Sequence, residues 1–359
     1  MQIKALNAVQ DGHNRCPGYT FLDTSGRPDV AHGVLGALKP DVCCYTSEHA
    51  ELVSKDGRTA PTVMGYAALF IEVKKKPELD AFNDPIEDAD LTDWKFVLDT
   101  RHLSVDDRDQ TRRAFGQNVV YAAEILARQH RHALYSITLS GSIARFIRWD
   151  RAGALVTAAF DIRKYPEYLC DFLWCFSLTT DAVRGYDLTV EVAHSTERAL
   201  FLAAIKAHIP GQAGVGFKND GKAVEEACRV HYVPGQVTAI RIPEEHSMNV
   251  RRFLVSRPLT YPLSAFGRGS RLYWAVEITA DGRPKVVLLK DTWRVDPPPS
   301  GCTEGATLES MRAAGVAEYL PDVLYHGDVI QRDAVPKPFE DKTIRMTMKE
   351  NGMLNVSFH

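Results

Sequence analysis

The chain has 359 residues and a formal net charge of −3 at pH 7, and 25% of its residues are charged while 45% are hydrophobic. This is the composition of an ordinary folded protein with enough residues for two domains, each with its own core. Because the overall charge is slightly negative, the composition excludes a global basic field, so nucleic-acid binding needs a local patch. The candidate patches are Lys74 to Lys76 and the run Arg128, His130, Arg131 and His132.

The cysteines and the N-terminus indicate an intracellular protein. The seven cysteines form no Cys-x-x-Cys pair and no Cys/His spacing typical of zinc, which favours reduced thiols. The N-terminus has no signal-peptide pattern, and no apolar stretch reaches the length of a membrane span. We therefore expect a protein of the cytoplasm or nucleus with no membrane partner.

The first half of the chain predicts a mixed sheet with a helix packed on it. Residues 1–40 show little periodicity, 41–45 and 62–74 have the apolar character of strands, and 77–105 are acidic and irregular. The strongest helix signal covers 106–132, where an apolar stripe is formed by Phe115, Val119, Ala122 and Leu126. Further strands are expected at 133–139, 144–149 and 154–157.

The second half predicts helices followed by a second set of strands. Helices are expected at 165–178 and about 193–208, and the Gly-rich residues 210–222 are typical of a linker. The remaining expectations are strands at 237–242, 252–255, 272–278 and 285–290 and a helix at 304–312. The whole pattern predicts an α/β chain of the α+β type.

Two acidic residues and one lysine form the first candidate site. Asp41 opens an apolar strand, and Glu72 and Lys74 close the next one. Residues i and i+2 of a strand point to the same face, so Glu72 and Lys74 can face one point in space. If the two strands pair, both carboxylates and the ammonium converge. Two carboxylates with water can hold Mg²⁺, and a lysine can orient a metal-bound water or stabilise charge on a phosphate.

A pair of helical residues adds to this site. Gln117 and Tyr121 are four residues apart in the predicted helix, so they share a face. The set Asp41, Glu72, Lys74, Gln117 and Tyr121 resembles the PD-(D/E)xK nuclease superfamily, and the Gln-x-x-x-Tyr pair resembles its RecB-like branch. The resemblance implies a restriction-endonuclease-like fold that uses Mg²⁺ or Mn²⁺. It also implies that Asp41 and Glu72 bind metal, that Lys74 is the catalytic lysine, and that Gln117 and Tyr121 support the site or contact a nucleic-acid backbone.

A second constellation lies between residues 251 and 312. Gly267-Arg268-Gly269 leads into a strand, Asp281-Gly282 turns the chain, and the next strand ends at Lys290. This order resembles the start of a protein-kinase N-lobe, where a glycine loop covers the phosphates of ATP and a strand lysine contacts them. The following helix is then expected to supply Glu304 or Glu309 to Lys290.

The wider amino-acid sequence resembles the fungal-type protein kinase family from about residue 40 to about residue 329. The segments that carry the resemblance are 146–153, 172–177, 184–187, 251–259, 267–269, 289–296 and 304–305. The family name implies ATP-dependent phosphorylation of serine or threonine. The chain departs from the kinase pattern because it has no His-Arg-Asp, no Asp-Phe-Gly and no Ala-Pro-Glu, and Leu272 stands in place of the third glycine.

These observations predict four parts and leave three functions open. We expect a nuclease-like domain over 1–160, a helical connection over 161–222, a kinase N-lobe-like region without its C-lobe over 223–335, and an atypical tail over 336–359. The leading function is metal-dependent hydrolysis of nucleic acid. The alternatives are an ATP-binding kinase family member present as an inactive fragment, and a non-catalytic interaction module. Without a C-lobe, apolar surface over about residues 260–330 is left uncovered, so we expect self-association through this region. A monodisperse and cooperatively melting monomer would contradict this expectation.

Overall fold

The computed structural model describes residues 3–10, 12–29, 37–54, 62–86, 94–98, 101, 103–212, 220–243, 249–279, 282–294 and 302–329. The chain divides into two compact units. The first comprises Met1–Tyr186, Leu263–Gly267 and Lys342–His359, and the second comprises Asp187–Pro262 and Arg268–Asp341.

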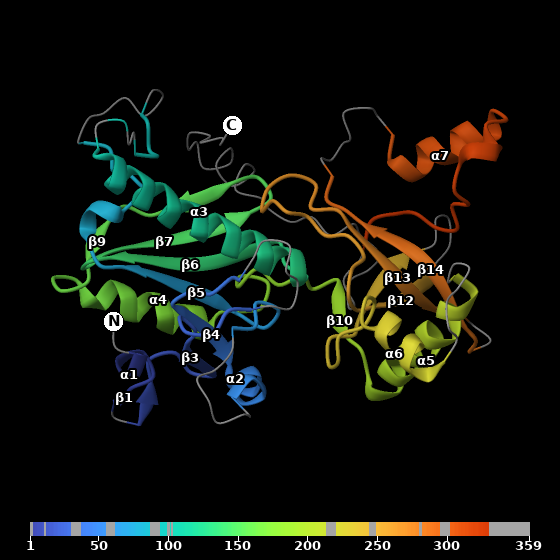
Figure 1. Ribbon diagram of the computed structural model, residues 1–359, viewed down its shortest axis with the longest axis horizontal. Coiled ribbons are helices and arrows are strands. Elements are labelled where there is room, and N and C mark those ends of the chain that lie inside the picture. The colour runs from blue at the N-terminus through green and yellow to red at the C-terminus, as the bar shows by residue number, and fades with distance from the viewer. Residues whose placement is uncertain are drawn as a thin grey trace. The chain divides into compact units, whose positions relative to one another are not determined.

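A mixed seven-stranded sheet forms the centre of the first unit (Figure 1). Its strands lie in the order β3-β4-β5-β6-β7-β8, with β9 also paired to β7. Only β5 and β6 are parallel, and such a pair needs a crossover connection, which the long helix α3 provides. The strands are β3 (Tyr19–Asp23), β4 (Val42–Thr46), β5 (Leu69–Lys74), β6 (Ala133–Ser140), β7 (Ile143–Asp150), β8 (Ala154–Val156) and β9 (Phe160–Asp161).

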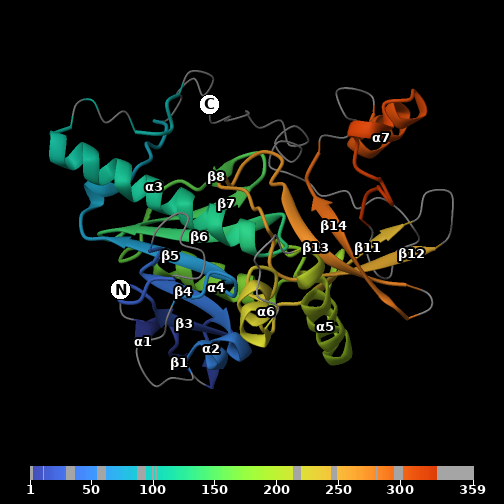
Figure 2. The same ribbon diagram turned by 45° about the vertical axis from the view of Figure 1, so that its right-hand side comes forward.

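Helices cover both faces of this sheet, with α3 (Val105–Arg128) on one and α4 (Pro166–Leu178) on the other (Figures 1 and 2). The alternation of strand β5 divides its side chains accordingly. Phe70 packs in the cluster with α3, while Leu69 and Ile71 pack in the cluster with α4. Glu72 and Lys74 follow Phe70 at steps of two and therefore lie on the α3 face.

The smaller elements of the first unit complete its N-terminal part. They are α1 (Ile3–Leu6), β1 (Val9–Gln10), β2 (His13–Asn14), α2 (Ser47–Ser54) and the short helix η1 (Pro77–Leu79). Helix α3 begins after Ser104, whose side chain accepts a hydrogen bond from the backbone N–H of Asp107 at 3.2 Å. This cap satisfies one of the free N–H groups of the first turn.

An antiparallel five-stranded sheet in the order β10-β11-β12-β13-β14 forms the second unit. Helices α5 and α6 pack on one face of it, and the opposite face packs around Phe253 and Tyr273 with Tyr325. The elements are β10 (Val190–Val192), α5 (Ser195–Gln212), α6 (Gly221–Cys228), β11 (Thr238–Pro243), β12 (Val250–Val255), β13 (Arg271–Ile278), β14 (Pro284–Asp291), α7 (Glu304–Ala313) and η3 (Ala317–Tyr319).

The predicted α+β class is confirmed, with a mixed sheet and helices first and an antiparallel sheet with a following helix second. One expected strand is too long, because residues 62–68 form turns and strand β5 begins only at Leu69. The backbone N–H of Tyr66 bonds to the carbonyl of Val63 at 3.0 Å, which closes a turn where a strand was expected. Elements β3, α2, β10 and α6 were not predicted. Among the described helices, none has the length and hydrophobicity that crossing a membrane requires.

We predict that Gly185→Ala lowers the free energy of unfolding by about 3 kcal/mol or more. Gly185 has a φ of +90°, and a Cβ there would stand 2.1 Å from the carbonyl oxygen of Ala133. The backbone cannot yield easily, since the N–H of His132 bonds to the Gly185 carbonyl at 2.9 Å. Chemical denaturation measures the effect. Gly26→Ala is the control, because nothing lies within 4 Å of its added Cβ, and equal stability of the two variants would contradict the account.

Candidate active site

The structure brings together all five residues of the first predicted site. Asp41 directly precedes β4, Glu72 and Lys74 lie near the end of β5, and Gln117 and Tyr121 project from α3. Strands β4 and β5 pair antiparallel, with Val42 opposite Ile71, so Asp41 comes beside the end of β5. The crossover helix then places its Gln117 side chain over the same point.

Lys74 is held between an acid and an amide. Its Nζ donates to Glu72 Oε1 at 2.5 Å and to Gln117 Oε1 at 2.7 Å. The Glu72 side chain is 4% exposed and that of Lys74 is 23% exposed, so the ammonium lies at the mouth of the site. These two bonds, one to Glu72 on β5 and one to Gln117 on α3, fix the direction of the Lys74 side chain.

Backbone contacts position the other carboxylate. Asp41 Oδ2 accepts a hydrogen bond from the backbone N–H of Val73 at 2.8 Å, which ties it between Glu72 and Lys74 in sequence. Tyr121 donates from its hydroxyl to the carbonyl of Lys39 at 3.1 Å and sets its ring edge-on to Phe70 at 5.6 Å. Tyr121 therefore anchors the segment that leads into Asp41.

Burial and mutual repulsion govern the charge of the acids. Burial raises the pKa of Glu72, the nearby Asp41 carboxylate raises it further, and the Lys74 ammonium opposes both. The pKa of the Tyr121 hydroxyl is also raised, first by burial and then by the charges of Glu72 and Asp41. Asp41 and Glu72 therefore lie within electrostatic range of each other.

Glu72 has a buried oxygen that a cation would satisfy. Glu72 Oε2 is buried and has no hydrogen-bond partner in the described part of the chain, and an unpaired buried oxygen is costly. Within the same residues, no group of three or more His, Cys, Asp or Glu side chains is placed to hold a metal. If a cation binds here, Asp41 and Glu72 would be its side-chain ligands and water would fill the rest of the shell, as Mg²⁺ prefers.

Residues that were not predicted line a small pocket beside Glu72 and Lys74. Thr138 and Ser140 contribute hydroxyls from β6, where they pair in register with Glu72 and Lys74. The pocket has a volume of about 20 Å³, which is room for one water molecule. The sequence signal for Thr138 and Ser140 is the alternation of polar residues in 136–140, which marks one face of a strand. The strand that pairs with it could not be known from the sequence.

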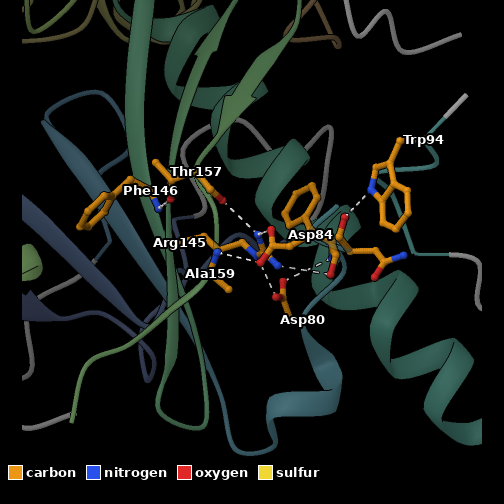
Figure 3. A network of polar contacts seen from close by, with 9 residues as sticks. Asp80, Asp84, Trp94, Arg145, Phe146, Thr157 and Ala159 are labelled. Atoms are coloured by element: carbon orange, nitrogen blue, oxygen red, sulfur yellow. Dashed lines mark hydrogen bonds and ion pairs between the residues drawn. The ribbon is translucent and has the colours of Figure 1, made fainter. Parts of the chain in front are cut away.

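A buried arginine fastens the loop next to this pocket. Figure 3 shows Asp80 and Asp84 pointing toward Arg145, whose Nε and Nη1 bond to them at 2.8 Å and 2.5 Å. Arg145 also donates to the carbonyl of Thr157 at 3.0 Å. Burial raises the pKa of Asp80, and Arg145 opposes that shift. Because Asp80 lines the pocket, this clamp holds the connection between β5 and α3 against the sheet.

The two predicted basic patches differ in exposure. Lys75 and Lys76 are exposed. The second run is not a surface patch: Arg131 is buried with its guanidinium 4.1 Å from the ring centre of Tyr186, and Arg128 bonds to Asp29 at 2.5 Å. These arginines stabilise the first unit and are not available to phosphates.

The second constellation forms in part. Lys290 Nζ donates to both carboxylate oxygens of Glu304 at 2.6 Å, while Glu309 instead pairs with His326 at 3.2 Å. The lysine and glutamate side chains are 42% and 54% exposed. The glycines are divided, since Gly267 lies in the first unit, where its N–H bonds to the Arg151 carbonyl, and Gly269 lies in the second. The structure thus joins Lys290 to Glu304.

Comparison with known proteins gives one match. The sequence model of a family described as fungal protein kinase matches residues 80–351, which is more than half of the chain. The matched span contains Gln117, Tyr121, Lys290 and Glu304 and extends past Val329, where the resemblance was expected to end, while Asp41, Glu72 and Lys74 precede it. No curated protein and no solved structure matches the chain.

We predict that Mn²⁺ raises the melting temperature more at about pH 8 than at about pH 5. Glu72 binds a proton more tightly in the folded chain, so without metal its contribution to stability is fully present below its ordinary pKa in the unfolded chain and is lost as pH rises through the raised pKa. Mn²⁺ must displace that proton. Thermal unfolding measures the shift, which Glu72→Gln should abolish and the exposed control Glu51→Gln should keep. An undiminished shift in Glu72→Gln would contradict the metal site.

Proposed function

The chain belongs to the fungal protein kinase family, and we propose that its first unit is a metal-dependent phosphodiesterase that acts on nucleic acid. One observation carries the proposal. Asp41, Glu72 and Lys74 meet on one face of the sheet, and a buried oxygen of Glu72 remains without a partner. The site resembles that of the PD-(D/E)xK nucleases, with Gln117 and Tyr121 on the adjoining helix as in the RecB-like branch.

Asp41 and Glu72 would hold Mg²⁺ or Mn²⁺ through their carboxylates. The bound ion would polarise the phosphodiester and lower the pKa of a coordinated water. The carboxylates supply the charge that keeps such an ion in place, and Asp41 is already directed by its bond from the Val73 N–H. Because the pKa of Glu72 is raised, a bound ion would compete with a proton at this carboxyl.

Lys74 supplies the fixed positive charge of the site. Gln117 and Glu72 hold its Nζ at the mouth, where it can orient a water or stabilise the charge that develops on a phosphate oxygen. Tyr121 acts at one remove, because it anchors the backbone at Lys39 and thereby the approach to Asp41. A Lys74 side chain that pointed away from Glu72 would have favoured the non-catalytic alternative, and the two side chains instead meet at 2.5 Å.

We predict that Lys74→Ala lowers the rate of Mn²⁺-dependent cleavage of single- or double-stranded DNA or RNA by about 100- to 1,000-fold, because removing one stabilising donor has that effect in other sites. Gel assays of cleavage measure the rate. Lys95→Ala removes an exposed lysine that is not one of the five site residues and should leave the rate unchanged. A well-folded native chain that cleaves no form of nucleic acid would overturn the proposed function.

The second unit favours a different candidate, ATP binding. Its supporting observation is the Lys290–Glu304 pair, the arrangement that orients a strand lysine toward phosphates in kinases. The chain has no His-Arg-Asp and no Asp-Phe-Gly to supply a base and a metal ligand. We propose weak nucleotide binding without phosphotransfer by this chain alone. We also retain self-association as a proposal, since Met311, Val316, Tyr319 and Leu324 are exposed here.

We predict that Lys290→Ala weakens ATP binding by at least about tenfold, as loss of a charge-assisted contact does. Calorimetric titration with MgATP measures the affinity. Lys285→Ala, at the other end of β14, is the matched control and should bind ATP like the native chain. Equal affinity in all three proteins would remove ATP binding by this pair from the account.

A further inference from the structure

Two exposed tyrosines form a stacked pair at the start of α4. Tyr165 is 46% exposed and Tyr168 is 49% exposed. Their ring centres lie 5.4 Å apart with an angle of 13° between the planes. Two parallel aromatic rings held together at the surface offer a flat face on which a further ring can stack.

The pair is the outer end of an aromatic series that reaches into the first unit. Tyr168 meets Phe160 edge-on at 5.5 Å, and Phe160 lies 5.1 Å from Phe146. Phe146 in turn stacks on Phe172 at 4.2 Å with an angle of 11°. Because the inner rings pack against the sheet and α4, the outer rings are ordered before any ligand arrives, which reduces the entropy cost of binding.

Positive charge lies directly beside the tyrosines. Arg163 and Lys164 precede Tyr165 and are exposed. Their turn is fixed, since the Asp161 carboxylate accepts from the Arg163 N–H at 2.9 Å and the Asp161 carbonyl accepts from the Tyr165 N–H at 2.9 Å. Cations and aromatic faces therefore occur in one rigid segment.

The same segment adjoins the carboxylate site through two backbone bonds. The N–H of Ile162 bonds to the Ser142 carbonyl at 2.9 Å, and the N–H of Gly141 bonds to the Lys74 carbonyl at 2.8 Å. The exposed Lys75 and Lys76 continue from there. In Figure 1, β9 and the start of α4 lie at the same end of the sheet, the left-hand end. The cations and tyrosines thus lie at the edge of the sheet where β5 ends.

We propose that this sheet-edge patch, formed by Lys75, Lys76, Arg163, Lys164, Tyr165 and Tyr168, binds single-stranded nucleic acid, which passes around the end of β5 to reach Asp41 and Glu72 on the opposite face of the sheet. The cations would contact phosphates while unpaired bases stack on the tyrosines. In a duplex the bases stack on one another and offer no free face, which is why a single strand is the occupant. The inference rests on the proposed function, for which it names the substrate class.

The local charge explains why stacking must contribute. Glu78 and Glu167 are also exposed near these cations, and the whole chain has a net charge of −3. Electrostatic attraction alone would therefore be weak at physiological salt. Base stacking on aromatic rings adds affinity that salt screens little and that depends on free base faces.

Fluorescence anisotropy with a labelled oligothymidylate, in EDTA, measures binding without cleavage. We expect the double substitution Tyr165→Ala with Tyr168→Ala to weaken binding about tenfold, as loss of base stacking does. The matched pair Tyr165→Phe with Tyr168→Phe keeps both rings and should bind like the native chain. Tyr319→Ala, which removes an exposed tyrosine of the second unit, should also have no effect. Lys164→Ala should reduce the slope of log K against log salt by about 0.7.

Two results would overturn the patch: the double alanine variant binds as tightly as the native chain, or the native chain binds a duplex as tightly as the single strand. These results are separate from those for the carboxylates. Cleavage that depends on Lys74 with unchanged binding by the alanine variant would reject the patch and keep the proposed function. Weakened binding by that variant, in a chain that never cleaves, would keep the patch and reject the proposed function.

Discussion

The buried carboxylate of Glu72 is the constraint on which the first unit depends. A carboxylate that is 4% exposed beside a second acid loses hydration and meets repulsion. The fold compensates by placing Lys74 two residues later on the same face and by bringing Gln117 from α3 to hold it. Removing one partner of a buried ion pair costs about 3–5 kcal/mol. The half-exposed Lys290–Glu304 pair is worth about 1 kcal/mol at most, so it orients side chains more than it stabilises the fold.

This constraint also explains the topology around the site. Gln117 can reach Lys74 only if α3 lies over the face of β5 that carries Glu72 and Lys74. The parallel pairing of β5 with β6 requires a crossover connection, and α3 provides it. The same pairing sets Thr138 beside Glu72 and Ser140 beside Lys74. The Arg145 clamp then holds the intervening loop, through Asp80, against the pocket (Figure 3). One oxygen of Glu72 is left over, and it is the reason to expect a cation.

Local periodicity made part of this predictable. Glu72 and Lys74 share a face because strands alternate, and Gln117 and Tyr121 share one because of the helical repeat. Long-range pairing was not accessible in this way. Thr138 and Ser140 lie in a strand whose neighbour depends on the crossover, and Gly267 belongs with the first unit through a contact to Arg151 more than a hundred residues earlier. Short elements such as β10 could not be predicted for a similar reason. Its three residues carry too little pattern, and the strand is stabilised by pairing with β11.

The proposed activity of the first unit requires a divalent cation between Asp41 and Glu72. The most direct measurement is an anomalous difference map at the manganese edge from crystals grown with Mn²⁺. The account predicts a peak in contact with both carboxylates and with Lys74 nearby at the mouth of the site. A well-ordered site with both acids visible and no peak between them, at a concentration of Mn²⁺ that saturates ordinary two-carboxylate sites, would contradict it.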